Sequence, residues 1–249
     1  MATPVLEVRG LQKRFAGIVA TNDLSLDVRA GEVHALIGPN GAGKTTLIAQ
    51  LQGELAPDAG EIIFNGRDIT REPAHRRAHF GIARSFQITS VFPQFTVLAN
   101  VALAAQARQG HGFRFFREAW TDPALTIPAR EAIDRIGLGA RADIHAEDLS
   151  HGERRQLELA MALAMKPALL LLDEPMAGMG RQDGQRMTRI LLGLKQTCAI
   201  LLVEHDMDAV FALADRVTVL VAGSAIATGT VDEIRNDPRV KAAYLGHGS

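Results

Sequence analysis

The chain has 249 residues, 47% of them hydrophobic, which allows one α/β domain with a sizeable core or two small subdomains. Its formal net charge of −1 provides no bulk field that would attract nucleic acid, so no nucleic-acid partner is expected. The only cysteine, Cys198, excludes an intrachain disulfide and a zinc site built from several cysteines. The first residues lack a signal-peptide pattern, and no apolar run approaches the roughly 18–20 residues of a spanning helix. We therefore expect a soluble, cytoplasmic protein whose membrane role would come through partners.

β-Strand patterns precede a glycine-rich loop in the first part of the chain. Residues 1–35 have the pattern of β structure, with apolar and polar residues alternating at 24–28. An apolar strand pattern at 33–37 is followed by a loop and then by a helical pattern at 45–51. The loop and the first helical residues read Gly38-Pro39-Asn40-Gly41-Ala42-Gly43-Lys44-Thr45-Thr46. This strand, loop and helix match the phosphate-binding P-loop, G-x-x-x-x-G-K-[ST], and predict a nucleotide-binding site.

The chemistry of this loop indicates its ligand. Glycines allow backbone N–H groups to turn inward and form a concave anion site, to which the positive end of the helix dipole contributes. Lys44 would reach the β- and γ-phosphates, and the hydroxyl of Thr45 would ligate Mg²⁺. A glycine-rich turn without a ligand is the alternative, but the lysine, the threonine and the preceding strand argue against it.

The middle of the chain combines one hairpin with helices. Residues 62–64 followed by Asn65-Gly66 predict a strand and a hairpin turn. Residues 97–108 are rich in alanine and leucine and predict a helix. Residues 130–165 are predicted to be helical again.

Residues 109–130, between these helices, are expected to be less regular. The residues that interrupt helical patterns there are Gly110, Gly112, Pro123 and Pro128. The aromatic residues that gather in the same stretch are Phe113, Phe115, Phe116 and Trp120. They predict either a local aromatic core or a partner-binding surface.

Strand and helix patterns alternate in the last third of the chain. Apolar strands are predicted at 168–172, 199–203 and 217–221, and helices at 182–195 and 206–213. This alternation predicts βαβ units and a parallel sheet. A capping-box pattern, Thr230-Val231-Asp232-Glu233, opens a last helix.

Two carboxylates end the strand predicted at 168–172. The carboxyl end of a parallel strand faces the ligand crevice of an open α/β sheet. Asp173 in that position can hold Mg²⁺, directly or through water. Glu174 can accept a proton from an attacking water. The alternative is that both carboxylates cap the next helix.

Three further features are ambiguous when each is taken alone. Ser150 and Glu153 have the spacing of a capping box, which predicts a good helix start and, equally, an anion site at a helix N-terminus. His205 follows a predicted strand, and a lone histidine there is usually structural. Gln87, after residues 82–86, is likewise unremarkable by itself.

The order of these features resembles that of the ATP-binding subunits of ABC transporters over nearly the whole chain. Gln87 matches the family's Q-loop, and residues 149–156 match its signature motif, usually LSGGQ. Residues 170–174 match the Walker B strand, His205 the switch histidine, and Phe15 the aromatic residue that stacks on adenine.

The resemblance assigns roles to single residues. Its catalytic residues would be Glu174, His205 and Gln87. Its metal ligands for Mg²⁺ would be Thr45, Gln87 and Asp173. The residues that bind ATP would be Phe15, residues 38–46, Ser150, Gly152 and Asp173.

The resemblance also implies a fold: a RecA-like P-loop NTPase core with an antiparallel β subdomain and an inserted helical subdomain. Residues 1–87 and 166–249 would form the core with the β subdomain, and residues 88–165 the helical subdomain. Two such subunits sandwich two ATP molecules in the family, each site combining one chain's P-loop with the signature motif of the other. The expected partners are a second ATPase subunit, membrane-spanning permease subunits and, indirectly, an extracytoplasmic solute-binding protein. The resemblance implies that the protein is cytoplasmic and binds peripherally at the inner face of the cell membrane.

Within the family, residues 83–87 and 173–178 resemble the importers of branched-chain amino acids, as does the long segment between Val101 and Arg130. Two departures matter. His151 and Glu153 replace the usual glycine and glutamine of the signature motif. Gly180 stands where the D-loop has aspartate or asparagine, so this chain lacks the usual side-chain contact across a dimer.

ATP hydrolysis that drives import of branched-chain or other hydrophobic amino acids, or of a similar small polar solute, is thus the predicted function. A lipid or lipopolysaccharide exporter ATPase is an alternative, since such cassettes look similar. An ABC ATPase that acts on DNA or ribosomes is another, although tandem cassettes and a long coiled-coil insertion are absent from the sequence. A weakly hydrolysing nucleotide switch would fit Gly180 and the altered signature motif.

Overall fold

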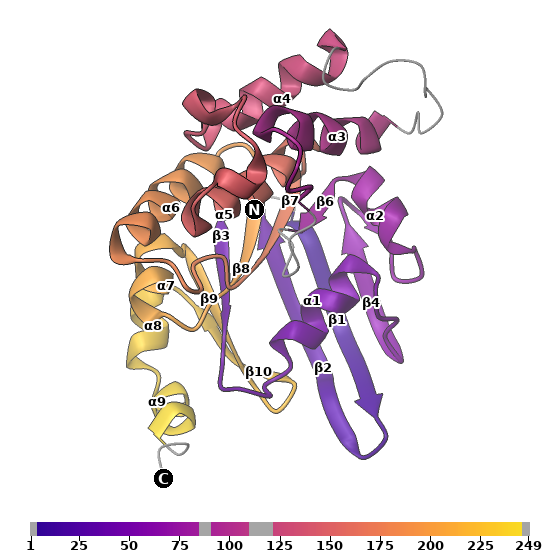
Figure 1. The fold of residues 1–249 in the computed structure, drawn as a ribbon. Helices are drawn as coiled ribbons and strands as arrows, with labels where there is room; N and C mark the ends of the chain where they lie inside the picture. Colours follow the sequence, from indigo (N-terminus) through magenta and orange to yellow (C-terminus); the bar gives the residue numbers. More distant parts are fainter. Residues whose placement is uncertain (1–3, 85–90, 110–121, 246–249) are drawn as a thin grey trace. The chain divides into compact units, whose positions relative to one another are not determined.

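The computed structural model describes residues 4–84, 91–109 and 122–245 (Figure 1). Gln87 and the aromatic residues between 113 and 120, which predict a local core or a partner-binding surface, lie outside these ranges. The chain divides into two compact units. The first comprises residues 1–82, 168–174 and 191–249, and the second comprises residues 83–167 and 175–190.

The first unit begins with an antiparallel sheet in the strand order β2-β1-β4-β5. Its strands are β1 (Pro4–Phe15), β2 (Ile18–Arg29), β4 (Ala59–Phe64) and β5 (Arg67–Asp68). The predicted hairpin at Asn65-Gly66 is confirmed: both residues have positive φ angles, 49° and 77°, between β4 and β5. Such angles are typical of the tightest hairpin turns, which favour this dipeptide.

The second sheet has the order β10-β9-β3-β8-β7-β6. Its strands are β3 (Val33–Ile37), β6 (Ile82–Arg84), β7 (Leu169–Asp173), β8 (Ala199–Val203), β9 (Arg216–Val221) and β10 (Ser224–Gly229). Strands β9, β3, β8 and β7 pair in parallel, as the alternating pattern predicts, and β10 pairs antiparallel with β9. All residues of β3, β7 and β8 are buried, which explains their continuous apolar runs. Cys198, just before β8, is buried.

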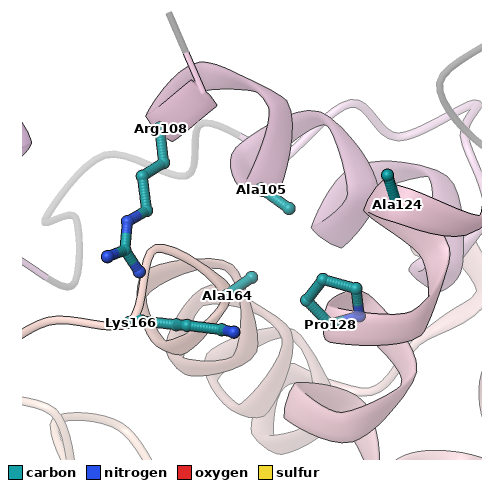
Figure 2. A pocket seen from close by; sticks show the side chains of 6 residues that line it. All are labelled: Ala105, Arg108, Ala124, Pro128, Ala164 and Lys166. Atoms are coloured by element: carbon teal, nitrogen blue, oxygen red, sulfur yellow. The ribbon is translucent and has the colours of Figure 1, made fainter.

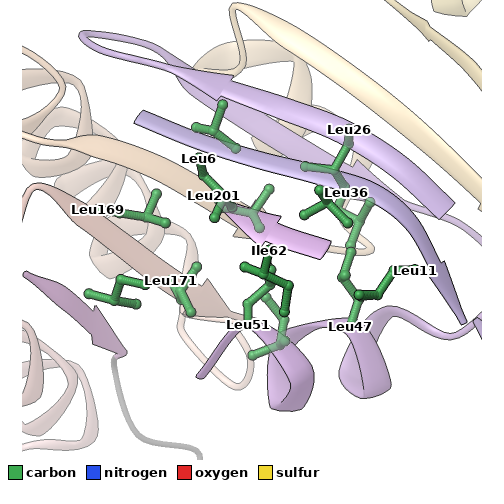
Figure 3. Close-up of a cluster of buried hydrophobic side chains, with 14 of the residues drawn as sticks. Leu6, Leu11, Leu26, Leu36, Leu47, Leu51, Ile62, Leu169, Leu171 and Leu201 are labelled. Carbon is green, nitrogen blue, oxygen red and sulfur yellow. The ribbon is translucent and has the colours of Figure 1, made fainter. Parts of the chain in front are cut away.

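Five helices accompany these sheets in the described part of the first unit. They are α1 (Lys44–Gln52), α2 (Ala74–Phe80), α7 (Met207–Leu213), α8 (Val231–Asn236) and α9 (Pro238–Leu245). A hydrophobic core in this unit includes residues of both sheets and of α1. Leu6 and Ile62 of the antiparallel sheet pack there with Leu201 of the parallel sheet and Leu51 of α1 (Figure 3). This packing fixes the helix that follows the P-loop against the strand that precedes it.

The second unit contains α3 (Val97–Gln109), α4 (Pro123–Arg135), α5 (His151–Ala164) and the first part of α6 (Arg181–Leu194). The prediction of irregular structure up to residue 130 was wrong, because α4 begins at Pro123 and continues through Pro128. Proline is tolerated in the first turn, where its missing N–H would lack a partner. The side chain of Asp122 caps the same turn by accepting from the N–H of Ala124, at 3.0 Å.

The prediction that residues 130–165 are helical is confirmed for the end of α4 and for α5, but not for the residues between them. Gly137, with a φ of +75°, follows the end of α4, and α5 begins only at His151. Between them lie two short 3₁₀ helices, η2 (Gly139–Arg141) and η3 (Ala146–Asp148). Glycine in this left-handed conformation is a common helix terminator.

No helix in the described parts of the chain is long and apolar enough to cross a membrane.

Candidate functional site

The P-loop connects the end of β3 to the start of α1. An added Cβ at Gly43, whose φ is +102°, would lie 2.2 Å from the carbonyl oxygen of Ala20. One at Gly38 would lie 2.2 Å from the carbonyl oxygen of Leu220. Neither position can carry a side chain, because the loop runs directly against strands β2 and β9. The loop is also held by a hydrogen bond of 2.9 Å from the N–H of Gly223 to the carbonyl oxygen of Ala42.

Lys44 is the first residue of α1, and its ammonium group is folded over the loop. Its Nζ donates to the carbonyl oxygens of Gly38, at 2.6 Å, and Pro39, at 3.0 Å. Partial burial lowers the pKa of Lys44, and the negative charges of Glu174 and Asp173 oppose that change. A cation and two carboxylates therefore meet at the end of the parallel sheet, with the hydroxyl-bearing residues Thr45 and Thr46 next in α1.

The two carboxylates have different surroundings. Asp173 is the buried last residue of β7, whereas the side chain of Glu174 is 45% exposed. Glu174 has a φ of +50°, which is rare for residues other than glycine, and its N–H donates to the carbonyl oxygen of Val203 at 2.8 Å. The next helix, α6, begins only at Arg181, so these carboxylates do not cap it. The Glu174 side chain is thus accessible to solvent at the end of the sheet. Strained backbone conformations of this kind are often found at functional sites.

His205 is brought to Glu174 by the neighbouring strand β8. Its Nδ1 lies 3.6 Å from Oε1 of Glu174, and both side chains are substantially exposed, at 64% and 45%. The backbone N–H of His205 donates to the buried carboxylate of Glu204 at 3.2 Å. Two of the three predicted catalytic residues, Glu174 and His205, are thus within reach of each other.

An exposed apolar patch lies at the β1–β2 hairpin, and the sequence pattern identified only one of its members. Phe15 is 45% exposed, and the neighbouring Ile18 and Val19 are 70% and 39% exposed. Lys13 Nζ lies 5.7 Å from the centre of the Phe15 ring. The next residue, Ala20, contacts the P-loop through its carbonyl oxygen, as described above. Apolar side chains placed at a turn between strands are the sequence signal that could have identified Ile18 and Val19.

The signature residues lie in the second unit, at the start of α5. Ser150 is the N-cap of α5 and forms the predicted capping box with Glu153. Gly152 is buried, and an added Cβ would lie 2.8 Å from Cγ of Asp183. His151 covers Gly178, where an added Cβ would lie 3.4 Å from its Nε2. The glycine of the motif is therefore explained by packing inside this unit, whatever its role toward a ligand.

A separate pocket of about 350 Å³ opens in the second unit (Figure 2). The residues that line it are Ala105, Arg108, Ala124, Pro128, Ala164 and Lys166. None of them belongs to the predicted nucleotide site.

Comparison with known proteins decides the family. Residues 21–177 match the family model described as ABC transporter. The chain belongs to the ABC transporter family of ATP-binding cassettes. Residues 226–249 of this cassette also match a model described as branched-chain amino acid ATP-binding cassette transporter.

Relatives of this cassette extend over its full length. It is 38% identical to the high-affinity branched-chain amino acid transport ATP-binding protein LivG of Salmonella typhimurium. It is 36% identical to the corresponding protein BraF of Pseudomonas aeruginosa. Each alignment covers 99% of this chain and 99% of the relative. A crystal structure of an ATP-binding cassette of an ABC transporter in its ADP conformation superposes with a TM-score of 0.89 at 28% identity, covering 99% of this chain and 100% of that one. The cassette fold expected from the sequence is thereby confirmed, and ABC cassettes of this kind are ATPases.

The close contact at Gly152 of this cassette makes a stability prediction. Gly152→Ala should lower the free energy of unfolding by about 1–3 kcal/mol, because the added methyl group overpacks against Asp183. Asp183→Ala alone should cost less than about 1 kcal/mol, the value of an acid in the first turn of a helix. Urea unfolding of both single variants and the double variant should give a double-variant loss smaller than the sum. Additive losses would contradict this contact as the reason for the glycine.

Proposed function

We propose that this cassette is the ATP-hydrolysing subunit of an importer for branched-chain amino acids. The observation that carries the proposal is similarity to LivG and BraF along the entire chain, including the C-terminal segment 226–249. The conjunction of Lys44, Asp173 and Glu174 at one end of the parallel sheet supports the hydrolytic part.

Residues 38–46 would bind the phosphates of ATP. Glycines such as Gly43, where an added Cβ would meet backbone, let the loop stay narrow, and backbone N–H groups in such a loop can approach an anion. Lys44 would exchange the carbonyl oxygens of Gly38 and Pro39 for the β- and γ-phosphate oxygens. The hydroxyl of Thr45 and the carboxylate of Asp173 supply the oxygen ligands that Mg²⁺ prefers, with Gln87 as a third. Mg²⁺ would neutralise charge that develops on the phosphates.

Glu174 would act on the attacking water. The water oxygen bonds to the γ-phosphorus, the bond from that phosphorus to the bridging oxygen of ADP breaks, and the water proton passes to the Glu174 carboxylate. His205, 3.6 Å away, would orient that carboxylate and the γ-phosphate. Exposure of both side chains suits a site that a second subunit closes.

That second subunit would be another cassette, whose Ser150 and Gly152 equivalents complete each ATP site. We propose one cassette domain over residues 1–249, with residues 1–87 and 166–249 as the core and 88–165 as the helical subdomain. It would bind permease subunits at the inner face of the cell membrane, and a solute-binding protein would deliver the amino acid outside.

Purification of the native complex tests this assignment. Mass spectrometry should find permease subunits with the cassette, and the complex in lipid should hydrolyse ATP faster when a leucine-loaded binding protein is added. Failure of leucine, isoleucine and valine to stimulate hydrolysis, with stimulation by another solute, would overturn the solute assignment.

Phe15→Ala should weaken ATP binding if Phe15, with Ile18 and Val19, holds the adenine ring. Base stacking on an aromatic side chain is worth about 1–3 kcal/mol in nucleic-acid systems, and we take that scale by analogy. Because Phe15 is 45% exposed, unfolding without nucleotide should change little. Lower thermal stability with unchanged ATP affinity would instead make Phe15 a core residue.

Gly180 bears on subunit pairing. We propose that the native transporter combines this chain with a different cassette that carries aspartate or asparagine at this place, since glycine offers no side chain across an interface. The purified chain alone should then hydrolyse ATP slowly, and the partner should raise turnover per site. A native complex with two copies of this chain and no second cassette would exclude the pairing. In that case backbone groups at 178–180 would make the contact.

A further inference from the structure

The Ser150–Glu153 capping box consists of two reciprocal hydrogen bonds between a side chain and a backbone N–H. Oε2 of Glu153 accepts from the backbone N–H of Ser150 at 2.9 Å. Oγ of Ser150 accepts from the backbone N–H of Glu153 at 3.2 Å. The box therefore fixes the backbone and the side chain of Ser150 together.

The second oxygen of the Glu153 carboxylate has its own partner. Nε of Arg141, at the end of η2, donates to Oε1 of Glu153 at 2.9 Å. The Glu153 side chain is 19% exposed and that of Arg141 is 47% exposed. The hydrogen bond from Ser150, followed by the contact with Arg141, lowers the pKa of Glu153, so the carboxylate stays ionised at neutral pH. Each oxygen is thus engaged, and the side chain has little freedom to turn.

This arrangement holds the Ser150 side chain against the Glu153 carboxylate. The serine oxygen accepts from the backbone N–H of Glu153, and the Ser150 side chain also hydrogen-bonds to the Glu153 carboxylate. When a phosphate is bound there, the serine hydroxyl can turn from the carboxylate to a phosphate oxygen, the acceptor that a helix N-terminus favours. The negative charge of Glu153 would oppose such an anion, and the guanidinium of Arg141 offsets it.

We propose that Glu153 is a positioning residue for Ser150 in ATP hydrolysis, supported by Arg141. The inference rests on the proposed function, in which Ser150 contacts the γ-phosphate of ATP held by a second cassette. Glutamate in place of the signature glutamine is then a working variant of the motif, since either residue can complete a capping box. The glutamate is then no argument for a nucleotide switch that hydrolyses ATP weakly.

The chain offers a matched control for a purely structural cap. Thr230 and Glu233 form a second capping box at the start of α8. Oε2 of Glu233 accepts from the N–H of Thr230 at 2.7 Å, and Oγ1 of Thr230 accepts from the N–H of Glu233 at 3.4 Å. Neither residue belongs to the proposed nucleotide site. Loss of either box should lower thermal stability, whereas only the first should affect turnover.

The test uses the full-length cassette in its complex with permease and partner cassette, with ATP turnover measured over a range of ATP concentrations. Glu153→Ala should lower kcat about tenfold, the loss that follows when one hydrogen bond to a charged group is no longer made in the closed state. Glu153→Gln should recover most of that loss, because its amide oxygen can still accept from Ser150. Glu233→Ala should shift Tm by a similar amount and leave kcat unchanged.

Three outcomes separate the explanations. Equal kcat for Glu153→Ala and Glu233→Ala, at comparable Tm, would overturn the positioning role. A Glu153→Gln variant as slow as Glu153→Ala would also overturn it, because the charge and not the cap would then matter. Ser150→Ala is the reference: if it keeps normal turnover, the proposed contact of Ser150 with ATP fails, whereas a slow Ser150→Ala with a normal Glu153→Ala removes only this inference.

Discussion

Glu174→Gln is expected to leave ATP binding intact and to lower turnover by about 10²–10⁴-fold, the contribution of a positioned general base. The amide has nearly the shape of the carboxylate but cannot take the proton of the attacking water. The exposed position of the Glu174 side chain leaves room for that water. Steady-state phosphate release, together with equilibrium binding of ATP, checks the result.

The same variant should accumulate as an ATP-bound dimer, because hydrolysis would no longer separate the subunits. Light scattering with and without ATP measures this change. Glu61→Gln is the matched control, since Glu61 is a 60% exposed glutamate on β4, outside the proposed site. Near-normal turnover of Glu174→Gln would remove Glu174 from the role of base.

Lys44→Ala should abolish tight ATP binding. The lysine is partly buried, and its ammonium group is bound by loop carbonyl oxygens that a phosphate would replace. Hydrogen bonds to charged groups contribute about 1.5–3 kcal/mol, so the dissociation constant should rise by at least tenfold. Isothermal titration calorimetry with ATP measures the change directly.

A surface lysine provides the comparison for this variant. Lys241→Ala, on an exposed position of α9, should bind ATP as the unmodified chain does. The fold of Lys44→Ala can be checked by its unfolding curve without nucleotide. Unchanged ATP affinity in a folded Lys44→Ala variant would make the P-loop assignment wrong.

The predicted helix boundaries between residues 109 and 165 were wrong where the local environment of a residue, and not its type, decides the structure. Pro123 and Pro128 were interpreted as breakers, but Pro123 occupies the first turn, which Asp122 caps, and Pro128 is accommodated within α4. The stretch 130–165 contains strong helix formers, and Gly137 in the left-handed conformation nevertheless follows the end of α4 there. Glycine ends the helix there because, without a Cβ, it readily adopts the left-handed conformation, and its N–H donates to the carbonyl oxygen of Asp134.

The features that follow directly from the order of residues have contiguous parts: the P-loop between β3 and α1, the buried parallel strands, and both capping boxes. Their physics is local, because phosphate-binding N–H groups, continuous apolar runs and N-caps involve residues within a few positions of one another. Only the tertiary structure placed His205 beside Glu174, ran strands β2 and β9 against Gly43 and Gly38, and packed Asp183 against Gly152. These contacts join residues distant along the chain, and the pairing of strands and the packing of helices determine them.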